Sequence, residues 1–371
     1  MKVIICGGGT VGHLTPGISI AELILQSDKD SDVLFVGRYG GEENAVIENR
    51  GYRLKTIKIS PITRKLTLKN LKSATSVVTS LIEAQSIINV EKPDLVIGTG
   101  GYVCWPMIKV AQKKKIPTIL HESNLIPGLA TKRLSKKCNK VLLNFKQSEN
   151  YFKFKDNLLT VGNPLPEAFY AISREQARRK LGLAKNDFFI LSFGGSGGAG
   201  RLNESIISLM EGYCRKKSSV KHLHGCGRRY FEKIKEKFPH FAQGKDGCKI
   251  VPFIDDMPLY MKAADTVISR CGAMTLSEIA TSQTVPILIP SPNVTNNHQY
   301  ENAKVFADSG AAIMIEETEL SERTLLDAVR YLESNVGIRE NMKSKLSAFR
   351  SYDVKKLILT AVKETQKIRA F

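Results

Sequence analysis

Two apolar segments of the chain run directly into glycine-rich turns. Residues 3–6 (VIIC) precede GGGTVG at 7–12, and residues 188–193 (FFILSF) precede GGSGGAG at 194–200. Glycine tolerates positive φ and lets a ligand approach the backbone, and a strand–turn–helix unit presents free backbone N–H groups that suit phosphate. Because this unit occurs twice, the sequence predicts two α/β halves that each begin with a ligand-binding loop.

Short β-branched runs recur in both halves with helical stretches between them. The expected strands are 3–6, 33–36, 54–59, 95–97, 118–120 and 141–143, then 188–193, 220–223, 249–251, 266–268, 286–289 and 311–315. This alternation predicts an α/β fold of two Rossmann-like domains, each a parallel sheet with helices on both faces. The prolines within GNPLP at 162–166 resist helix and strand and mark a hinge. We therefore expect domains at 1–162 and 163–350, and a C-terminal helix over 351–371 that packs back on the first domain.

The chain is strongly basic, with 55 Lys and Arg against 36 Asp and Glu and a net charge of +19. Residues 50–72 contain basic side chains and no acid, and a second basic cluster lies at 132–140. Such patches attract nucleic acid, anionic lipid or a charged substrate, or are solvated surface. No stretch approaches the ~18 apolar residues of a membrane span, and no signal peptide is expected. Seven scattered cysteines favour a reduced, cytoplasmic setting.

The first glycine turn also fits the dinucleotide fingerprint, with glycines at 7, 9 and 12. A dehydrogenase needs an acid after the second strand to hold the ribose diol, whereas residues 37–39 here are Gly-Arg-Tyr. Arg38 could bind a 2′-phosphate instead, so an NADP enzyme stays open. Two glycine loops, one in each half, fit a nucleotide-sugar transferase better than a single dinucleotide site.

Several short motifs, in this order, resemble the MurG family of UDP-N-acetylglucosamine transferases. They are GGTVGH at 8–13, GTGGY at 98–102, HESN at 121–124, GNP at 162–164, GGSGGA at 194–199, FIDDM at 253–257, RCGAMTLSE at 270–278 and NHQ at 297–299. The resemblance implies a GT-B architecture, with the acceptor domain first and the UDP-sugar domain second around a central cleft. It implies transfer of N-acetylglucosamine to undecaprenyl-pyrophosphoryl-N-acetylmuramyl-pentapeptide (lipid I to lipid II) in peptidoglycan synthesis, without a cofactor.

For the donor, the resemblance implies that Glu278 holds the ribose hydroxyls of UDP and that Ser196 and nearby amides hold the α-phosphate. It also implies that the Ile254 backbone contacts uracil and that Gln299 bonds the sugar hydroxyls. The residues expected to bind substrate are Thr10, Val11, Gly12, Tyr102, Asn124, Ser196, Ile254, Arg270, Ala273, Met274, Thr275, Leu276, Ser277, Glu278, His298 and Gln299. The pattern alone favours another interpretation at one place, because Thr275-x-x-Glu278 is typical of a helix capping box. Residues 296–298 would likewise suit a surface turn.

His13 is the residue expected to perform acid–base catalysis. A lone histidine near a helix start is more often structural, but this one lies in a glycine turn of the acceptor half, and an ordinary imidazole suits proton removal from a sugar hydroxyl. The expected reaction is an inverting displacement, in which the 4-hydroxyl of N-acetylmuramic acid attacks the anomeric carbon opposite UDP. Loop amides and helix N-termini would stabilise the departing diphosphate, so the mechanism requires no metal. Tyr102 and Asn124 would line the acceptor side.

Residues 62–82 alternate apolar side chains with cations. Periodicity alone favours a core-facing helix, but a lipid-linked acceptor favours a helix lying on an anionic membrane, at its cytoplasmic face. The residues expected to face the membrane are Arg64, Lys65, Leu66, Leu68, Lys69, Leu71 and Lys72.

Three metal-like patterns lack the spacing or the setting of a metal site, so none is expected. The aspartates at 28, 30 and 32 lie at the wrong end of the sheet and lack the glycine and glutamate of a calcium loop. Strand alternation explains His222-x-His224-x-Cys226, and His121-Glu122 has no second histidine at metalloprotease spacing.

Three positions depart from the family pattern. Val11 stands in place of a glycine, Pro166 in place of an arginine and Gly197 in place of a polar side chain. These differences bear on nucleotide contacts more than on the reaction class. The open alternatives are a GT-B transferase acting on another glycolipid or natural product, a UDP-sugar epimerase, and a nucleic-acid-binding paralogue. The retained His13 and Glu278 and the lack of an RNA-binding motif argue against nucleic acid as a partner.

Overall fold

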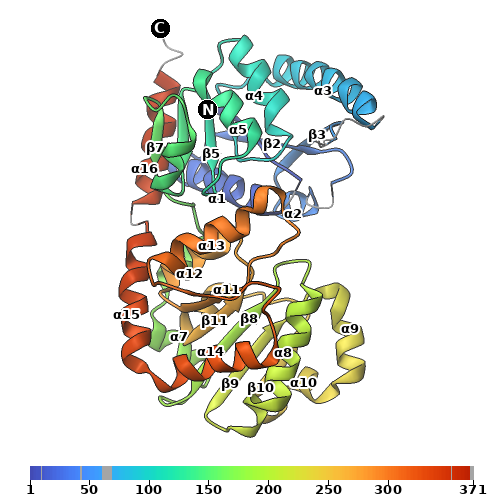
Figure 1. Ribbon diagram of the computed structural model, residues 1–371. Coiled ribbons are helices and arrows are strands. Elements are labelled where there is room, and N and C mark those ends of the chain that lie inside the picture. Colours follow the sequence, from blue (N-terminus) through green and yellow to red (C-terminus); the bar gives the residue numbers. More distant parts are fainter. Residues whose placement is uncertain (10, 42–43, 61–68, 352, 368–371) are drawn as a thin grey trace. The chain divides into compact units, whose positions relative to one another are not determined.

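The computed structural model describes residues 1–9, 11–41, 44–60, 69–351 and 353–367, with the side chains of residues 11, 69–75 and 295 left out. Contacts within the chain divide it into unit 1 (Met1–Leu165 and Ser351–Phe371) and unit 2 (Pro166–Arg350). Each unit is built on one parallel sheet with helices around it (Figure 1). The two α/β sheets that the sequence predicts are therefore confirmed.

Unit 1 contains a seven-stranded sheet in the order β3-β2-β1-β4-β5-β6-β7, and every neighbouring pair is parallel. The strands are β1 (Lys2–Cys6), β2 (Asp32–Arg38), β3 (Arg53–Ile57), β4 (Leu95–Gly98), β5 (Thr118–Glu122), β6 (Lys140–Leu143) and β7 (Leu158–Thr160). The helices are α1 (Val11–Ser27), α2 (Asn44–Glu48), α3 (Lys69–Glu91), α4 (Cys104–Lys113), α5 (Leu129–Leu134) and α16 (Val354–Lys367).

Alternation along the buried strands of unit 1 builds two hydrophobic layers, one on each face of the sheet. Val3 and Ile5 of β1 pack in the layer that contains α1 and Ile358 of α16. Ile4 and Cys6 face the opposite layer, which contains α3 and α4. The C-terminal helix α16 contacts α1, β5 and β6, so it completes the core of unit 1 (Figure 1).

Unit 2 contains a six-stranded sheet in the order β10-β9-β8-β11-β12-β13, again with parallel neighbours. The strands are β8 (Phe188–Phe193), β9 (Val220–Gly225), β10 (Cys248–Val251), β11 (Thr266–Ser269), β12 (Val285–Leu288) and β13 (Ile313–Met314). The helices are α6 (Ala168–Ala171), α7 (Arg174–Lys180), α8 (Gly200–Gly212), α9 (Arg228–Lys237), α10 (Pro239–Gln243), α11 (Met257–Ala263), α12 (Ala273–Ser282), α13 (His298–Asp308), α14 (Glu322–Ser334) and α15 (Val336–Leu346).

Some element bounds differ from the sequence prediction. The run 311–315 yields only the two residues of β13, because this edge strand pairs with β12 at two positions and then leaves the sheet. A helix does occupy much of the segment 62–82, but as the longer α3, which extends to Glu91. Residues 61–68, including Arg64, Lys65, Leu66 and Leu68, lie outside the described residues. None of the described helices is long and apolar enough to cross a membrane.

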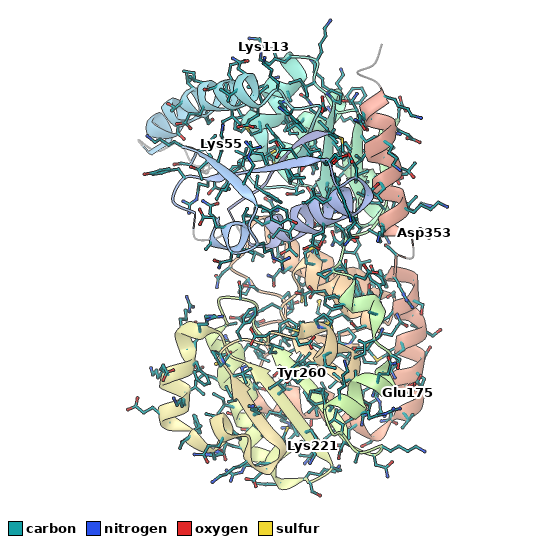
Figure 2. The ribbon with its side chains drawn as sticks, turned by 180° about the vertical axis from the view of Figure 1, so that it is seen from behind. Lys55, Lys113, Glu175, Lys221, Tyr260 and Asp353 are labelled. Carbon is teal, nitrogen blue, oxygen red and sulfur yellow. The ribbon has the colours of Figure 1, made fainter. Side chains whose placement is uncertain are left out.

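The basic stretch 50–72 contains no acid in sequence, but acids from other elements neutralise its first part. The two Nη atoms of Arg53 lie 2.5 Å from Asp32 Oδ2 and 2.9 Å from Glu91 Oε2. Lys55 Nζ lies 2.5 Å from Glu91 Oε1 (Figure 2), and Arg50 pairs with Glu22 at 2.8 Å. For this part of the stretch, the ion pairs favour the alternative of an ordinary solvated surface.

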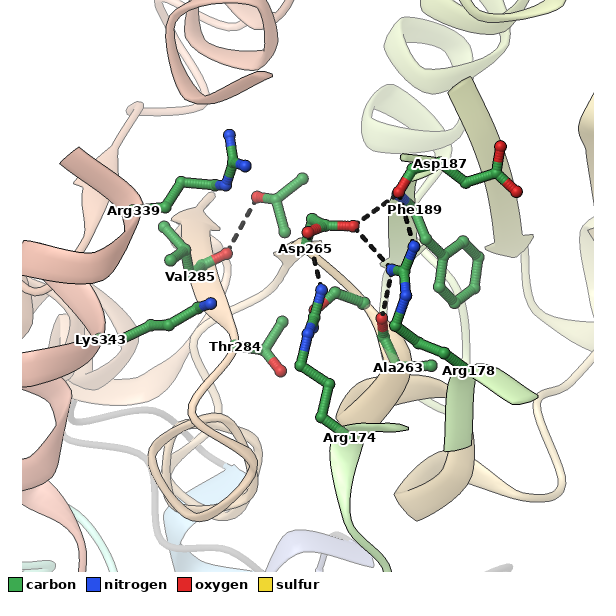
Figure 3. Close-up of polar contacts among 12 residues, drawn as sticks. Arg174, Arg178, Asp187, Phe189, Ala263, Asp265, Thr284, Val285, Arg339 and Lys343 are labelled. Carbon is green, nitrogen blue, oxygen red and sulfur yellow. Dashed lines mark hydrogen bonds and ion pairs between the residues drawn. The ribbon is translucent and has the colours of Figure 1, made fainter. Parts of the chain in front are cut away.

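A buried acid ties α7 to the sheet of unit 2. Asp265, just before β11, accepts hydrogen bonds from Arg174 at 2.7 Å, from Arg178 at 3.0 Å and from the Phe189 N–H at 2.9 Å (Figure 3). The sequence analysis did not single out this cluster. Because it lies at the amino ends of β8 and β11, it stands at the opposite edge of the sheet from the loops that follow those strands, and we interpret it as structural.

Replacing Asp265 would leave two largely buried arginines without their carboxylate, and breaking such a pair typically costs about 3–5 kcal/mol. We expect Asp265→Ala to lower the free energy of unfolding of unit 2, measured by urea denaturation, by about 3 kcal/mol. Arg323→Ala serves as the control, because that guanidinium is exposed and lies 3.9 Å from Asp327 on the surface. Equal losses in the two variants would contradict the structural role of Asp265.

Candidate active site

Both sheets reverse their strand order at one point, and open α/β sheets bind ligands outside the carboxyl ends of the strands at such a point. The reversal lies between β1 and β4 in unit 1, and between β8 and β11 in unit 2. His13 and Tyr102 follow β1 and β4, whereas Ser196 and Glu278 follow β8 and β11. The topology therefore gathers the predicted residues at one edge of each sheet.

In unit 1, the loop after β4 packs closely on the loop after β1. Gly100 and Gly101 have φ of +113° and +78°, and a Cβ on either would overlap the His13 imidazole or the Gly8 carbonyl. Thr99 Oγ1 donates to the His13 carbonyl at 2.7 Å. These contacts hold a partly exposed His13 in the first turn of α1. The turn Thr99–Gly101 thus fixes the place of the predicted base.

Tyr102 and Asn124 follow the neighbouring strands β4 and β5. The Tyr102 ring lies against Gly9, where a Cβ would be 2.9 Å from Cε1. Asn124 Nδ2 and its backbone N–H both donate to Glu122 Oε1, at 3.3 and 3.1 Å. The other oxygen of Glu122 accepts from the Gly128 N–H at 2.9 Å. Glu122 was missed as an organiser of this loop, although it stands inside the motif HESN.

Two further predicted residues, Val11 and Gly12, begin α1. Thr10 lies outside the described residues, and Gly12 is exposed. Val11 is the first residue of α1 and therefore has helical backbone angles.

In unit 2, the loop after β8 offers unpaired backbone donors. The N–H groups of Gly195, Ser196 and Gly197 form no hydrogen bond among the described residues, whereas the Gly198 N–H closes the loop on the Gly195 carbonyl at 3.0 Å. Ser196 and Gly197 are exposed, and a side chain at 197 would meet open space. Successive free N–H groups of this kind form an anion-binding nest.

Helix α12 begins earlier than the capping-box interpretation requires. Its N-cap is Gly272, without a side-chain cap, so Thr275 lies in the first turn and Glu278 in the second. The capping-box interpretation of Thr275 and Glu278 is therefore wrong. The N–H groups of Met274 and Thr275 form no hydrogen bond within the described part of the chain, so they extend the set of free donors to the helix terminus.

Glu278 is a half-buried carboxyl without a cation. Within the described residues it forms neither a hydrogen bond nor an ion pair, and burial raises its pKa to about 7. A carboxyl left unsatisfied beside a helix terminus is costly to the fold and is typical of a ligand-binding residue.

The remaining residues of unit 2 line or support the same edge. The Ile254 side chain is buried against Gly225, while its backbone N–H and C=O make no hydrogen bond among the described residues. Gln299 Oε1 accepts from the N–H groups of Cys271 and Ser291, at 3.2 and 2.9 Å, and Nε2 forms no hydrogen bond among the described residues.

Arg270 donates to the Ile289 and Pro290 carbonyls, both at 3.2 Å, and pairs with Glu317. These contacts favour a supporting role for Arg270 over direct contact with substrate. His298 is partly exposed at the start of α13, after two residues with positive φ. Ala273, Leu276 and Ser277 complete the first turns of α12.

The metal-like patterns have other uses in the structure. His121 Nε2 lies 3.2 Å from the Gly162 carbonyl oxygen, and His222 and His224 both contact Ser192. Asp28 accepts from the Asp30 N–H and from Ser31 Oγ in the turn before β2. Among the described residues, no group of three or more His, Cys, Asp or Glu could hold a metal ion.

The raised pKa of Glu278 predicts a stability gain on its removal. The folded protein keeps the proton up to about pH 7, whereas the unfolded chain loses it near pH 4.5, so the cost appears as pH rises through this window. We expect Glu278→Gln to raise the free energy of unfolding at pH 8 by about 2 kcal/mol, with little difference at pH 4.5. Urea denaturation at both pH values measures this, and a loss of stability at pH 8 would contradict an unsatisfied carboxylate.

The profile of the Glycosyltransferase family 28 N-terminal domain matches residues 3–143, and that of the family's C-terminal domain matches residues 189–358. A protein of Thermoanaerobacter sp. (strain X514) is 37% identical over 364 residues, which cover 98% of this chain and 99% of that protein. It is named UDP-N-acetylglucosamine–N-acetylmuramyl-(pentapeptide) pyrophosphoryl-undecaprenol N-acetylglucosamine transferase. A protein of the same name from Acetivibrio thermocellus is 40% identical over 334 residues, which cover 90% of this chain and 89% of that protein.

The crystal structure of Acinetobacter baumannii MurG superposes with a TM-score of 0.75 at 23% identity, over 98% of this chain and 99% of that one. This likeness concerns the fold, and it agrees with the two parallel sheets described above. From the matches of both domains and of relatives at 37% and 40% identity, the chain belongs to the MurG family within glycosyltransferase family 28.

Proposed function

We propose that the protein transfers N-acetylglucosamine from UDP-N-acetylglucosamine to the 4-hydroxyl of the muramyl sugar of undecaprenyl-pyrophosphoryl-N-acetylmuramyl-pentapeptide. The observation that carries this proposal is the set of free amides after β8 and β11 together with the unsatisfied Glu278, at the edge where α/β sheets bind nucleotides. The relatives at 37% and 40% identity carry the name of this reaction.

In this proposal, unit 2 binds the donor. The free N–H groups of Gly195–Gly197, with Ser196 Oγ, receive the diphosphate, aided by the terminus of α12. The Glu278 carboxylate accepts hydrogen bonds from the ribose hydroxyls, which supplies the partners that it lacks in the protein. The Ile254 backbone bonds uracil, and Gln299 Nε2 bonds a sugar hydroxyl. Each of these roles uses a group that forms no hydrogen bond among the described residues.

Unit 1 binds the acceptor and supplies the base. His13 takes the proton of the 4-hydroxyl while that oxygen forms a bond to the anomeric carbon from the side opposite UDP. The bond from this carbon to the diphosphate breaks, and its electron pair leaves with UDP. Free amides stabilise the charge on the departing diphosphate without proton transfer, so we expect turnover to persist in a chelator.

We further propose that α3 brings unit 1 to an anionic membrane, where a lipid-linked acceptor resides. Val78 and Ile82 are 58% and 65% exposed, and four residues apart they share one face of this helix. Lys69, Leu71 and Lys72 open the same helix, although their side chains are not described. Exposed apolar residues on a helix whose sequence begins with cations suit peripheral attachment. We propose that this attachment is to the cytoplasmic face of the membrane, and that the partner of the basic surface is anionic lipid rather than nucleic acid.

The catalytic roles predict separate kinetic effects. General-base catalysis typically contributes about 100-fold or more, so His13→Ala should lower kcat by about 100-fold. Glu278→Ala should raise KM for UDP-N-acetylglucosamine by about tenfold, with a smaller change in kcat. The assay follows labelled N-acetylglucosamine onto a short-chain lipid-linked muramyl pentapeptide in the presence of EDTA.

His240→Ala is the matched histidine control, because His240 pairs with Glu211 at 2.7 Å on the far side of unit 2's core and has no proposed role. Full activity of His13→Ala, or loss of wild-type activity in EDTA, would contradict the mechanism. Donor binding without transfer to this acceptor would refute the acceptor assignment alone.

The proposed membrane contact predicts position-dependent effects along α3. We expect Val78→Asp with Ile82→Asp to weaken sedimentation with anionic phosphatidylglycerol vesicles by about tenfold, because two exposed apolar side chains leave the interface. Val90→Asp is the control, since Val90 is 68% exposed on the same helix but lies near its far end. Equal binding by all three proteins would contradict the membrane role of this face.

A further inference from the structure

Unit 2 has two histidines in its core that the proposed reaction does not use. His222 and His224 of β9 are buried, and the hydroxyl of Ser192, on the neighbouring strand β8, contacts both rings. Ser192 Oγ is 2.7 Å from His222 Nε2 and 2.8 Å from His224 Nδ1. The pKa of each histidine is lowered by burial, that of His224 to about 4, so both rings are neutral at pH 7.

The contacts of the Asn203 amide define the tautomer of His224. Asn203 of α8 donates from Nδ2 to the Cys226 carbonyl at 2.9 Å, so its Oδ1 faces His224 Nε2 at 3.1 Å. A flipped amide would set Oδ1 against the Cys226 carbonyl. His224 therefore carries its proton on Nε2 and donates it to Asn203, which leaves Nδ1 as an acceptor.

This tautomer of His224 determines the direction of the other hydrogen bonds in the cluster. Ser192 Oγ–H donates to His224 Nδ1, and His222 Nε2–H then donates to Ser192 Oγ. His222 Nδ1 is left to accept from Cys214 Sγ, 3.5 Å away. The result is a relay of hydrogen bonds through Cys214, His222, Ser192, His224 and Asn203 to the Cys226 carbonyl. The Ser192 carbonyl oxygen also lies 3.2 Å from His224 Nδ1, so Ser192 contacts this ring through both its side chain and its backbone.

The relay ends beneath the glycine loop. The Cys226 carbonyl lies so close to Gly198 that a Cβ there would overlap it, and a Cβ on Gly227 would be 2.7 Å from Gly198 Cα. Asn203 also contacts the other end of the loop, because its backbone N–H donates to the Ala199 carbonyl at 2.8 Å. Asn203 thus joins the loop, the first turn of α8 and the end of β9.

We propose that Asn203 and His224 are positioning residues for the donor, because their relay fixes the Cys226 carbonyl, on which Gly198 packs, and Gly198 in turn closes the loop of Gly195–Gly197 through its bond to the Gly195 carbonyl. This inference rests on the proposed function, in which those amides bind the diphosphate. Apolar side chains could fill this part of the core without needing hydrogen-bond partners. The inference explains why hydrogen-bonded imidazoles stand there instead.

The test uses the full chain and isosteric variants. We expect Asn203→Leu and His224→Leu to raise the dissociation constant for UDP, measured by titration calorimetry, by about tenfold. His224→Gln keeps an N–H near the place of Nε2 and should recover most of the affinity. Thr266→Val is the control, because it removes a buried 2.9 Å hydrogen bond to Val285 at the amino end of β11 and should leave UDP binding unchanged.

A second measurement does not depend on the donor. Heteronuclear 15N NOEs of the Gly195–Gly198 amides should fall in both leucine variants and stay at the wild-type value in Thr266→Val. Wild-type affinity and wild-type NOEs in the leucine variants would overturn the inference. Failure of the wild-type protein to bind UDP, with NOEs that still fall in the variants, would refute the proposed function and retain the positioning role. If the leucine variants do not fold, Ser192→Ala takes their place as the variant that interrupts the relay, and His224→Gln remains the variant expected to keep most of the affinity.

Discussion

Parallel strands place all their carboxyl ends on one edge of a sheet, and this edge carries the residues to which the proposed mechanism assigns chemistry. Because the strand order reverses between β8 and β11, the loops that follow them diverge and leave backbone donors unpaired. The same reversal between β1 and β4 lets Gly100 approach His13. The order of the strands thus determines where the groups of the proposed mechanism lie.

Buried polar groups have opposite effects on stability at the two edges of the sheet in unit 2. At the amino ends of the strands, Asp265 is fully paired with two arginines and a backbone N–H, so it stabilises the fold. At the carboxyl ends, Glu278 has no partner among the described residues and costs stability as the pH rises from about 4.5 to about 7. The relay from Cys214 to Cys226 combines features of both cases. Its side chains form hydrogen bonds with one another, and it ends at the glycine loop after β8. Polar groups without partners among the described residues therefore lie at the proposed ligand-binding edge, and polar groups with partners support it.

Much of this architecture can be predicted from the sequence, because it depends on local pattern. Alternating apolar runs predict the strands, and glycine turns predict which strands open each unit. The capping-box interpretation of Thr275 and Glu278 failed because a sequence pattern does not say where a helix begins, and Gly272 starts α12 earlier. The motif resemblance, rather than periodicity, identified Glu278 as a candidate ligand-binding residue.

Long-range partners escaped prediction for a physical reason. Arg53 pairs with Glu91 only because β3 and the end of α3 are neighbours in space. The surface there is therefore partly neutral, although the stretch of sequence that contains Arg53 has no acid. The histidine relay likewise needs the register of β8 on β9, which pairs Ser192 with His224. Side-chain alternation correctly places both histidines on one face of the strand, but it does not reveal what they contact.

The central claim is that the diphosphate of UDP binds the free amides after β8 while the ribose binds Glu278. A crystal structure of the protein with UDP tests this directly. The account predicts phosphate oxygens within hydrogen-bond distance of the Gly195–Gly197 N–H groups and both ribose hydroxyls on the Glu278 carboxylate. UDP bound elsewhere on unit 2, with these amides and Glu278 still without partners, would contradict it.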